Sequence, residues 1–154
     1  MIVEFDGQYD FLSNFYHSPF VHEGIAYPTN EHFFQAMKTL DIDERKKIAA
    51  AETPGLAKRM GRSVQLRPDW EKVKVYYMEL GLRLKFANKT LAEKLLATGD
   101  EELVEGNWWH DNTWGNCHCP QCSRIGGRNL LGMLLMELRK ELQYGTSSDE
   151  VAHF

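Results

Sequence analysis

The fold is decided by residues 27–38, which read YPTNEHFFQAMK. Pro28 favours an extended entry and Thr29 or Asn30 can cap the first free backbone N–H groups, so this stretch predicts the start of a helix. At about 100° per residue, one side of the helix is apolar and faces a core. That apolar side consists of Phe33, Ala36, Met37 and Leu40.

The opposite side of the same helix is polar and allows two interpretations. It carries Glu31, Gln35 and Lys38. A carboxylate in the first turn, an amide one turn later and an ammonium two turns later could together hold a polar ligand. An ordinary amphipathic helix with a solvated face would show the same pattern.

Composition places the chain among ordinary soluble globular proteins. It has 154 residues, 43% hydrophobic and 26% charged, which suits one domain of common size. A net charge of −4 excludes a global electrostatic footprint for nucleic acid. No apolar run approaches the roughly 18 residues that cross a bilayer, and the N-terminus lacks the features of a signal peptide. These features predict the cytoplasm and no membrane partner.

Two further segments of the first half offer binding groups. Asn14 lies in the aromatic segment 10–16, DFLSNFY, either bonded to backbone within a loop or facing a pocket. Lys58, Arg59 and Arg62 crowd the end of a helix that Thr53-Pro54 should start. These cations would suit a phosphate, although a solvated basic turn has the same composition.

The coarse pattern of the chain is helical. It predicts a hairpin at 20–27 with its turn at Glu23-Gly24, helices at 43–51, from 54, at 70–86 and from 90, and a last helix through Leu142. In the 70–86 helix the expected core stripe is Val73, Tyr77, Leu80 and Leu84. We expect one domain over residues 1–145 and a frayed tail over 146–154.

Residues 103–115, LVEGNWWHDNTWG, break every periodic pattern and hold three of the four tryptophans. A loop that mixes aromatic with polar residues favours a functional site. Its candidates are Glu105, Asp111 and Trp114. Asn129 follows in the glycine-rich entry to the last helix, where backbone N–H groups could face an anion.

Residues 117–122, CHCPQC, contain all three cysteines of the chain. Three thiolates and one histidine could close a tetrahedral zinc site. His110 and His118 are both near in sequence, and the spacing does not choose between them. Free thiols and a redox role are the alternatives. The metal candidates are Cys117, Cys119 and Cys122.

Taken together, these segments resemble the NADAR family, which includes the riboflavin-biosynthesis-intermediate N-glycosidases. The resemblance extends from about Phe5 to Leu142. Its motifs are FLSNF at 11–15, YPTNEHFFQA at 27–36, AKRMGR at 57–62, LVE at 103–105, DNTWG at 111–115, NLLG at 129–132 and LMELR at 135–139.

The resemblance implies a compact, mostly helical α+β domain that hydrolyses the N-glycosidic bond between a ribose phosphate and a base. In riboflavin-linked members the substrates are aminopyrimidine ribosyl phosphates, whereas other members act on ADP-ribose attached to guanine. The family's catalytic carboxylate corresponds to Glu31, and its loop motif corresponds to Asp111, Trp114 and Gly115. The cysteine segment is not general to the family, so the resemblance does not address a metal.

The chemistry of such a reaction agrees with these residues. Cleavage of a ribosyl C–N bond passes through an oxocarbenium-like state that needs a nearby anion and an attacking water. Glu31 could act as a general base or as a nucleophile. Asp111 is the candidate for protonating or hydrogen-bonding the leaving base. The expected substrate-binding residues are Asn14, Lys38, Arg59, Arg62, Glu105, Trp114 and Asn129.

Three functions therefore compete. They are an N-glycosidase acting on phosphorylated ribosyl pyrimidines, an ADP-ribosyl glycohydrolase of the same fold, and a non-catalytic nucleotide or ADP-ribose binding module. No cofactor is required for catalysis in the first two, and structural zinc is the one metal considered. Nucleic acid would be a partner only when ADP-ribosylated, and the oligomeric state is left open.

Overall fold

A computed structural model describes residues 1–152, with side chains described as far as Gly145. Contacts within the chain divide it into two compact units. One consists of Asn14–Ala87, and the other joins Met1–Ser13 to Asn88–Phe154. Each unit is described by itself below.

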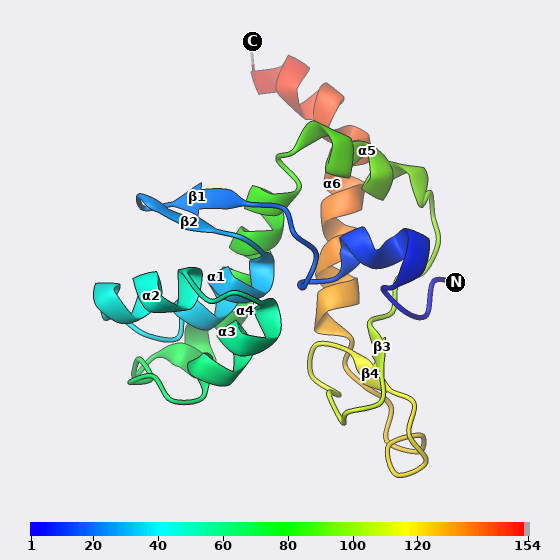
Figure 1. Cartoon of the computed structure of the whole chain (residues 1–154). Coiled ribbons are helices and arrows are strands. Elements are labelled where there is room, and N and C mark those ends of the chain that lie inside the picture. The colour runs from blue at the N-terminus through cyan, green and yellow to red at the C-terminus, as the bar shows by residue number, and fades with distance from the viewer. Residues whose placement is uncertain (153–154) are drawn as a thin grey trace. The chain divides into compact units, whose positions relative to one another are not determined.

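The Asn14–Ala87 unit contains a hairpin and four helices (Figure 1). They are β1 (Phe20–His22), β2 (Ile25–Tyr27), α1 (Asn30–Ala36), α2 (Ile42–Ala49), α3 (Pro54–Gly61) and α4 (Trp70–Lys85). The strands pair antiparallel, with Phe20 opposite Tyr27. Glu23 and Gly24 have φ values of 49° and 79°, the left-handed pair that a tight hairpin turn requires. The predicted hairpin is confirmed.

Helix α1 is buried along its whole length. The hydroxyl of Thr29 caps it by accepting the backbone N–H of His32 at 3.1 Å. The ring of Phe33 lies edge-on to Phe20 and Tyr27, with centroids 5.3 Å away in each case. A helix of only seven residues gains little from propensity, so packing on every side stabilises it.

Two expectations about the core of this unit are wrong. Leu40 is 58% exposed because it lies beyond the end of α1, where helical periodicity no longer applies. The buried residues of α4 are not the predicted stripe but Trp70, Met78, Gly81, Leu82 and Lys85. The reason is close approach: a Cβ on Gly81 would lie 2.9 Å from a ring carbon of Phe33, so glycine lets α1 pack there.

The other unit consists of short elements around two longer helices. They are the 3-10 helix η1 (Gly7–Leu12), α5 (Lys89–Ala97), β3 (Gly106–Asn107), β4 (Asn116–Cys117) and α6 (Leu130–Ala152). Strands β3 and β4 pair in parallel, with Asn107 opposite Cys117. The side chain of Asn88 caps α5 by accepting the N–H of Leu91 at 3.1 Å.

The predicted fold class, a mainly helical α+β protein with a few short strands, is confirmed. Helix α6 continues to Ala152, so most of the predicted tail is helical, and residues 153–154 lie outside the described residues. The single domain over 1–145 stays a prediction. Among the described residues, no helix combines the length and apolar character that crossing a membrane needs.

Candidate active site and cysteine cluster

The polar side of α1 is not solvated at its first two positions. Glu31 and Gln35 are 7% and 4% exposed. The amide Nε2 of Gln35 donates to Oε1 of Glu31 at 2.8 Å. The backbone N–H of Glu31 donates to the carbonyl of Asn14 at 3.0 Å. A buried carboxylate held in this way agrees with the ligand-binding interpretation and excludes an ordinary solvated face.

Lys38, which follows α1, interacts with the charge of this carboxylate and with two other cations. Burial lowers the pKa of Lys38, the Glu31 carboxylate opposes this shift, and the charges of Arg62 and Lys58 lower the pKa further. Three charged groups from α1, α3 and the residue that follows α3 therefore act on Lys38. Lys38 and the two cations that act on it could together bind an anion.

The structure favours Lys58 over Arg59 as a member of this charge group. Lys58 is half-buried, whereas Arg59 is exposed. Lys58 and Arg62 are four residues apart and so share a helix face, from which Arg59 is rotated by about 100°. The sequence placed Lys58 among the cations that suit a phosphate, but the final set of expected binding residues included Arg59 and Arg62 without it. A role of Arg59 in binding stays a prediction.

Asn14 supports the start of α1. Its side-chain oxygen accepts a hydrogen bond from Nδ2 of Asn30 at 2.9 Å, and its amide nitrogen lies 3.4 Å from the sulfur of Met78. Both asparagines are buried. These contacts give Asn14 a structural task in the unit, and its predicted role in binding substrate stays a prediction.

In the other unit, two of the predicted residues are bonded to backbone. The Asn129 side chain accepts the N–H of Glu105 at 3.0 Å and donates to the carbonyl of Leu103 at 2.9 Å. Oδ1 of Asp111 accepts the N–H groups of Thr113 and Trp114 at 3.0 and 2.9 Å. Both side chains therefore fix the course of the loop.

The remaining predicted residues of this loop, Glu105 and Trp114, are half-buried. Oε2 of Glu105 accepts a hydrogen bond from Nδ2 of Asn107 at 3.3 Å. Asn107, which is 1% exposed, also donates to the carbonyl of Asp111 at 2.8 Å. The sequence did not indicate Asn107 as a site residue, because no spacing rule distinguishes it. The catalytic role of Asp111 and the binding roles of Glu105, Trp114 and Asn129 stay predictions.

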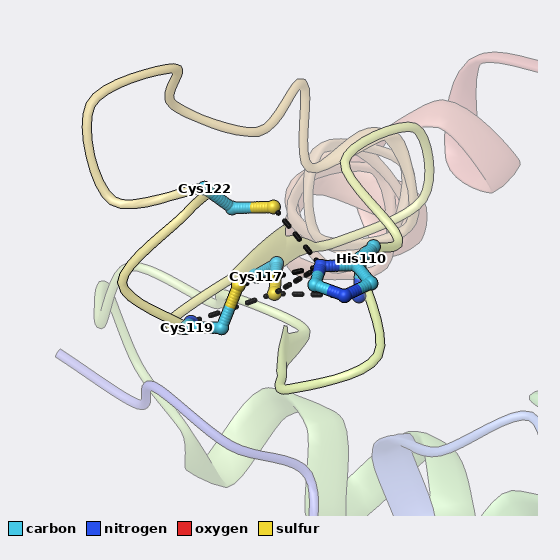
Figure 2. Close-up of side chains that lie close together, drawn as sticks. All are labelled: His110, Cys117, Cys119 and Cys122. Atoms are coloured by element: carbon cyan, nitrogen blue, oxygen red, sulfur yellow. Dashed lines mark hydrogen bonds between the residues drawn. The ribbon is translucent and has the colours of Figure 1, made fainter.

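The three cysteines and one histidine converge in a cluster (Figure 2). Nδ1 of His110 lies 3.3 Å from the sulfurs of Cys119 and Cys122 and 3.9 Å from that of Cys117. All four donor atoms lie within 4.8 Å of one another, so the cluster could hold a metal ion. The histidine that the sequence left open is therefore His110. The ring of His118 packs instead against Trp108, with centroids 5.9 Å apart.

The local backbone explains how this cluster forms. His110 has a φ of 68°, a left-handed conformation that is uncommon for a residue with a side chain. Its backbone N–H donates to the sulfur of Cys117 at 3.3 Å, as does that of Cys119 at 3.5 Å. The cysteines are all buried, because the chain from β4 turns back on itself through hydrogen bonds of Cys122 and Ser123 to the Cys119 carbonyl.

The thiols differ in acidity. Burial opposes ionisation of Cys117, but the N–H groups of Cys119 and His110 and the two neighbouring thiols outweigh it and lower the pKa of Cys117 to about 7. For Cys122, the Asn112 side chain favours the thiolate, yet burial and the other two thiols raise its pKa. A thiolate at Cys117 is the form that a metal ion binds.

Comparison with known proteins identifies the class. The fold is that of the NADAR domain, whose family model matches residues 4–143. The chain belongs to this family. It is 42% identical over 137 residues to N-glycosidase YbiA of Escherichia coli (strain K12), an alignment that covers 87% of this chain and 82% of that protein.

The solved structure of YbiA and one further relative agree. The NMR structure of the E. coli protein YbiA superposes with a TM-score of 0.80 at 40% identity, covering 95% of this chain and 87% of that one. Riboflavin biosynthesis protein VVA0006 of Vibrio vulnificus is 39% identical over 145 residues, which are 90% of this chain and 37% of that protein. The resemblance drawn from the sequence motifs is thereby confirmed.

Proposed function

We propose that this protein is an N-glycosidase that hydrolyses the C–N bond between a ribose phosphate and a base, acting on aminopyrimidine ribosyl phosphates of early riboflavin biosynthesis. The names of the relatives, N-glycosidase YbiA and riboflavin biosynthesis protein, support the reaction class and its context. The observation that carries the proposal is the buried Glu31 carboxylate, which interacts with Lys38, a cation on which Lys58 and Arg62 also act.

The reaction needs an anion at the ribosyl carbon. As the C–N bond breaks, the base leaves with the electron pair and the sugar acquires oxocarbenium character. A carboxylate fixed at that point stabilises the positive charge, since it requires no reorganisation during the reaction. Water supplies the oxygen of the new C–O bond, and its proton passes to the carboxylate, which returns a proton through solvent to the nitrogen of the leaving base. Glu31 is the group that we assign to this task.

The cations suit the phosphate of the same substrate. Lysine and arginine bind phosphate by charge-assisted hydrogen bonds, which are stronger than neutral ones. Lys38 and Lys58 are half-buried, and Arg62 is exposed. A substrate that bears its phosphate on the ribose would bring the phosphate near these cations while the reacting carbon faces Glu31.

Substitution of the carboxylate tests the proposal. Glu31→Gln should lower kcat by about 10²–10⁴, the usual contribution of a general acid or base. The melting temperature should stay the same, because the new amide oxygen can still accept from Gln35. Glu52→Gln, at an exposed position, is the matched control. Near-normal turnover in the Glu31 variant with an unchanged melting temperature would refute the assignment.

We also propose that the cysteine cluster holds one structural Zn²⁺. Zinc takes Cys sulfur at about 2.3 Å and His nitrogen at about 2.0–2.1 Å in a tetrahedron, which separates neighbouring donors by about 3.5–3.8 Å. The sulfur-to-nitrogen distances of 3.3–3.9 Å fit this geometry. Four protein ligands leave no open position, which is typical of structural rather than catalytic zinc. The cytoplasm, where thiols stay reduced, is the proposed compartment.

A further inference from the structure

The amide of Gln35 lies between the proposed catalytic carboxylate and a glycine of the next packed helix. Gln35 is one turn after Glu31 on α1, and its Nε2 donates to Oε1 of Glu31 at 2.8 Å. Gly61, the last residue of α3, is buried against the same amide.

The orientation of this amide is fixed by chemistry. An ionised carboxylate only accepts hydrogen bonds, so the NH₂ group of Gln35 must face Glu31. Its oxygen then faces Gly61. A Cβ on Gly61 would overlap that oxygen and would lie 2.8 Å from the amide carbon and 3.1 Å from Cβ of Gln35. Any residue other than glycine must therefore displace the amide.

The arrangement is not one that stability alone would favour. Oε1 of Gln35 is buried and has no hydrogen-bond donor among the described residues. An unsatisfied buried acceptor destabilises a fold, and an apolar side chain of similar volume would avoid that cost. A local rule broken in this way is expected where a side chain serves a site.

We infer that Gln35 is a positioning residue, which orients the carboxylate of Glu31 toward the reacting carbon, and that Gly61 provides the space for it. This inference rests on the proposed function, because the carboxylate must be the reacting group for its orientation to matter. A displacement of about 1 Å at a reacting group can reduce turnover by about 10²-fold, so a single hydrogen bond at this point is enough to affect kcat.

Four variants test the inference by steady-state kinetics and thermal unfolding: Gln35→Ala, Gly61→Ala, the double variant, and Gly55→Ala as the control. The control lies on the same helix α3, and a Cβ there meets only the Thr53 hydroxyl at 3.9 Å. Gln35→Ala and Gly61→Ala should each lower kcat by about 10- to 100-fold with little change in KM, because each removes or displaces one hydrogen bond to a charged group. Gly55→Ala should leave kcat unchanged.

The double variant separates orientation from packing. The new methyl group on residue 61 can occupy the volume that the Gln35 amide vacates, so the melting temperature should rise above that of Gly61→Ala. The kcat should stay as low as in Gln35→Ala. Recovery of kcat together with stability would show that Gln35 only fills space, and an unchanged kcat in Gln35→Ala would likewise overturn the inference.

A spectroscopic measurement keeps the inference separate from the proposed function. If the wild-type protein releases no base, the proposed function fails, and the side-chain NH₂ resonance of Gln35 still reports the contact. This resonance, assigned by its loss in Gln35→Ala, should shift in Glu31→Gln and Gly61→Ala but not in Gly55→Ala. A resonance that shifts in neither Glu31→Gln nor Gly61→Ala would show that the contact with Glu31 does not exist and would overturn the inference.

Discussion

At the scale of single residues, the cations on α3 and after α1 should make the protein prefer phosphorylated over dephosphorylated substrates, and this preference can be measured. Arg62 is exposed, and its charge lowers the pKa of the half-buried Lys38. Two cations that repel each other are stabilised when an anion binds between them, since the anion offsets the repulsion that each imposes on the other. Loss of either cation should therefore weaken binding of phosphate more than binding of sugar or base.

Arg62→Ala should raise KM about tenfold for a phosphorylated ribosyl substrate, because it removes a charge-assisted contact worth about 1.5 kcal/mol. A dephosphorylated substrate should be almost unaffected. Lys47→Ala, at an exposed position on α2, is the control and should change neither value. Steady-state kinetics on the substrate pair decides the point. Equal losses on both substrates would mean that the phosphate is held by other residues.

The buried His32 should make the stability of the Asn14–Ala87 unit depend on pH. It is 1% exposed, and its Nε2 lies 3.0 Å from the carbonyl of Ala51, which can only accept, so this nitrogen bears the proton. Nδ1 then accepts from the hydroxyl of Thr29 at 2.7 Å. Burial lowers the pKa of His32, the Ala51 carbonyl opposes this shift, and the charge of His17 adds to it.

Because folding lowers the pKa of His32, the direction in which pH changes the free energy of unfolding is determined. Below about pH 6.5 the unfolded chain takes up a proton at His32 that the folded chain resists, so the free energy of unfolding should fall as pH drops through that value. Urea titrations between about pH 5 and 7.5 should show this dependence, and His32→Gln should flatten it. His17→Gln, at an exposed site, should retain most of it. A dependence identical in wild type and His32→Gln would contradict the assignment.

At the scale of elements, a very short parallel pair organises the loop of the second unit. Strands β3 and β4 contribute two residues each, and they place Asn107 beside Cys117. The Asn107 side chain accepts the N–H groups of Trp109 and Asp111 at 3.3 and 3.1 Å. A pair of this length is not stable by itself, so cross-links from side chains, including the cysteine cluster, must stabilise the loop.

Zinc should be part of that stabilisation. The purified protein should contain about one equivalent of zinc, and its removal should lower the melting temperature, because a structural site contributes directly to folding. Cys119→Ser and His110→Ala should lose the metal, whereas His118→Gln should keep it. Elemental analysis is the measurement. Metal-free protein after anaerobic purification, with all three thiols open to titration, would rule out the site.

At the scale of the whole molecule, the net charge of −4 contrasts with the local gathering of Lys38, Lys58 and Arg62. A broad attraction for nucleic acid is therefore not expected, and an anionic small molecule fits the distribution of charge better. ADP-ribose attached to guanine also satisfies this description, which is why the substrate must be tested directly.

Two substrates should be compared with the whole protein: an aminopyrimidine ribosyl phosphate, followed by release of ribose 5-phosphate, and ADP-ribosyl-guanosine, followed by release of guanine. We expect the higher kcat/KM on the first, because the relatives include a riboflavin biosynthesis protein. Turnover of the second alone would support the ADP-ribosyl glycohydrolase. Binding of either without turnover in wild type would support a binding module instead.

Local signals in the sequence determined the elements that depend on neighbouring residues. Thr29, one of the two caps that the sequence offered, and Thr53 cap their helices, and Glu23-Gly24 forms the predicted hairpin turn, because caps and tight turns are set by the chemistry of a few adjacent residues. The cysteine spacing predicted a candidate metal cluster for the same reason. The order of the motifs along the chain was sufficient to indicate the family.

Only the tertiary structure decided which of these residues are buried and which partners they meet. Gly61 of α3 covers the amide of Gln35, and no pattern within α1 encodes that contact. His110 rather than His118 joins the cysteines because β3 and β4 pair and the chain turns left-handed at His110. Periodicity reports which residues share a face of a helix, whereas burial and ligation depend on segments distant in sequence, which only folding brings together.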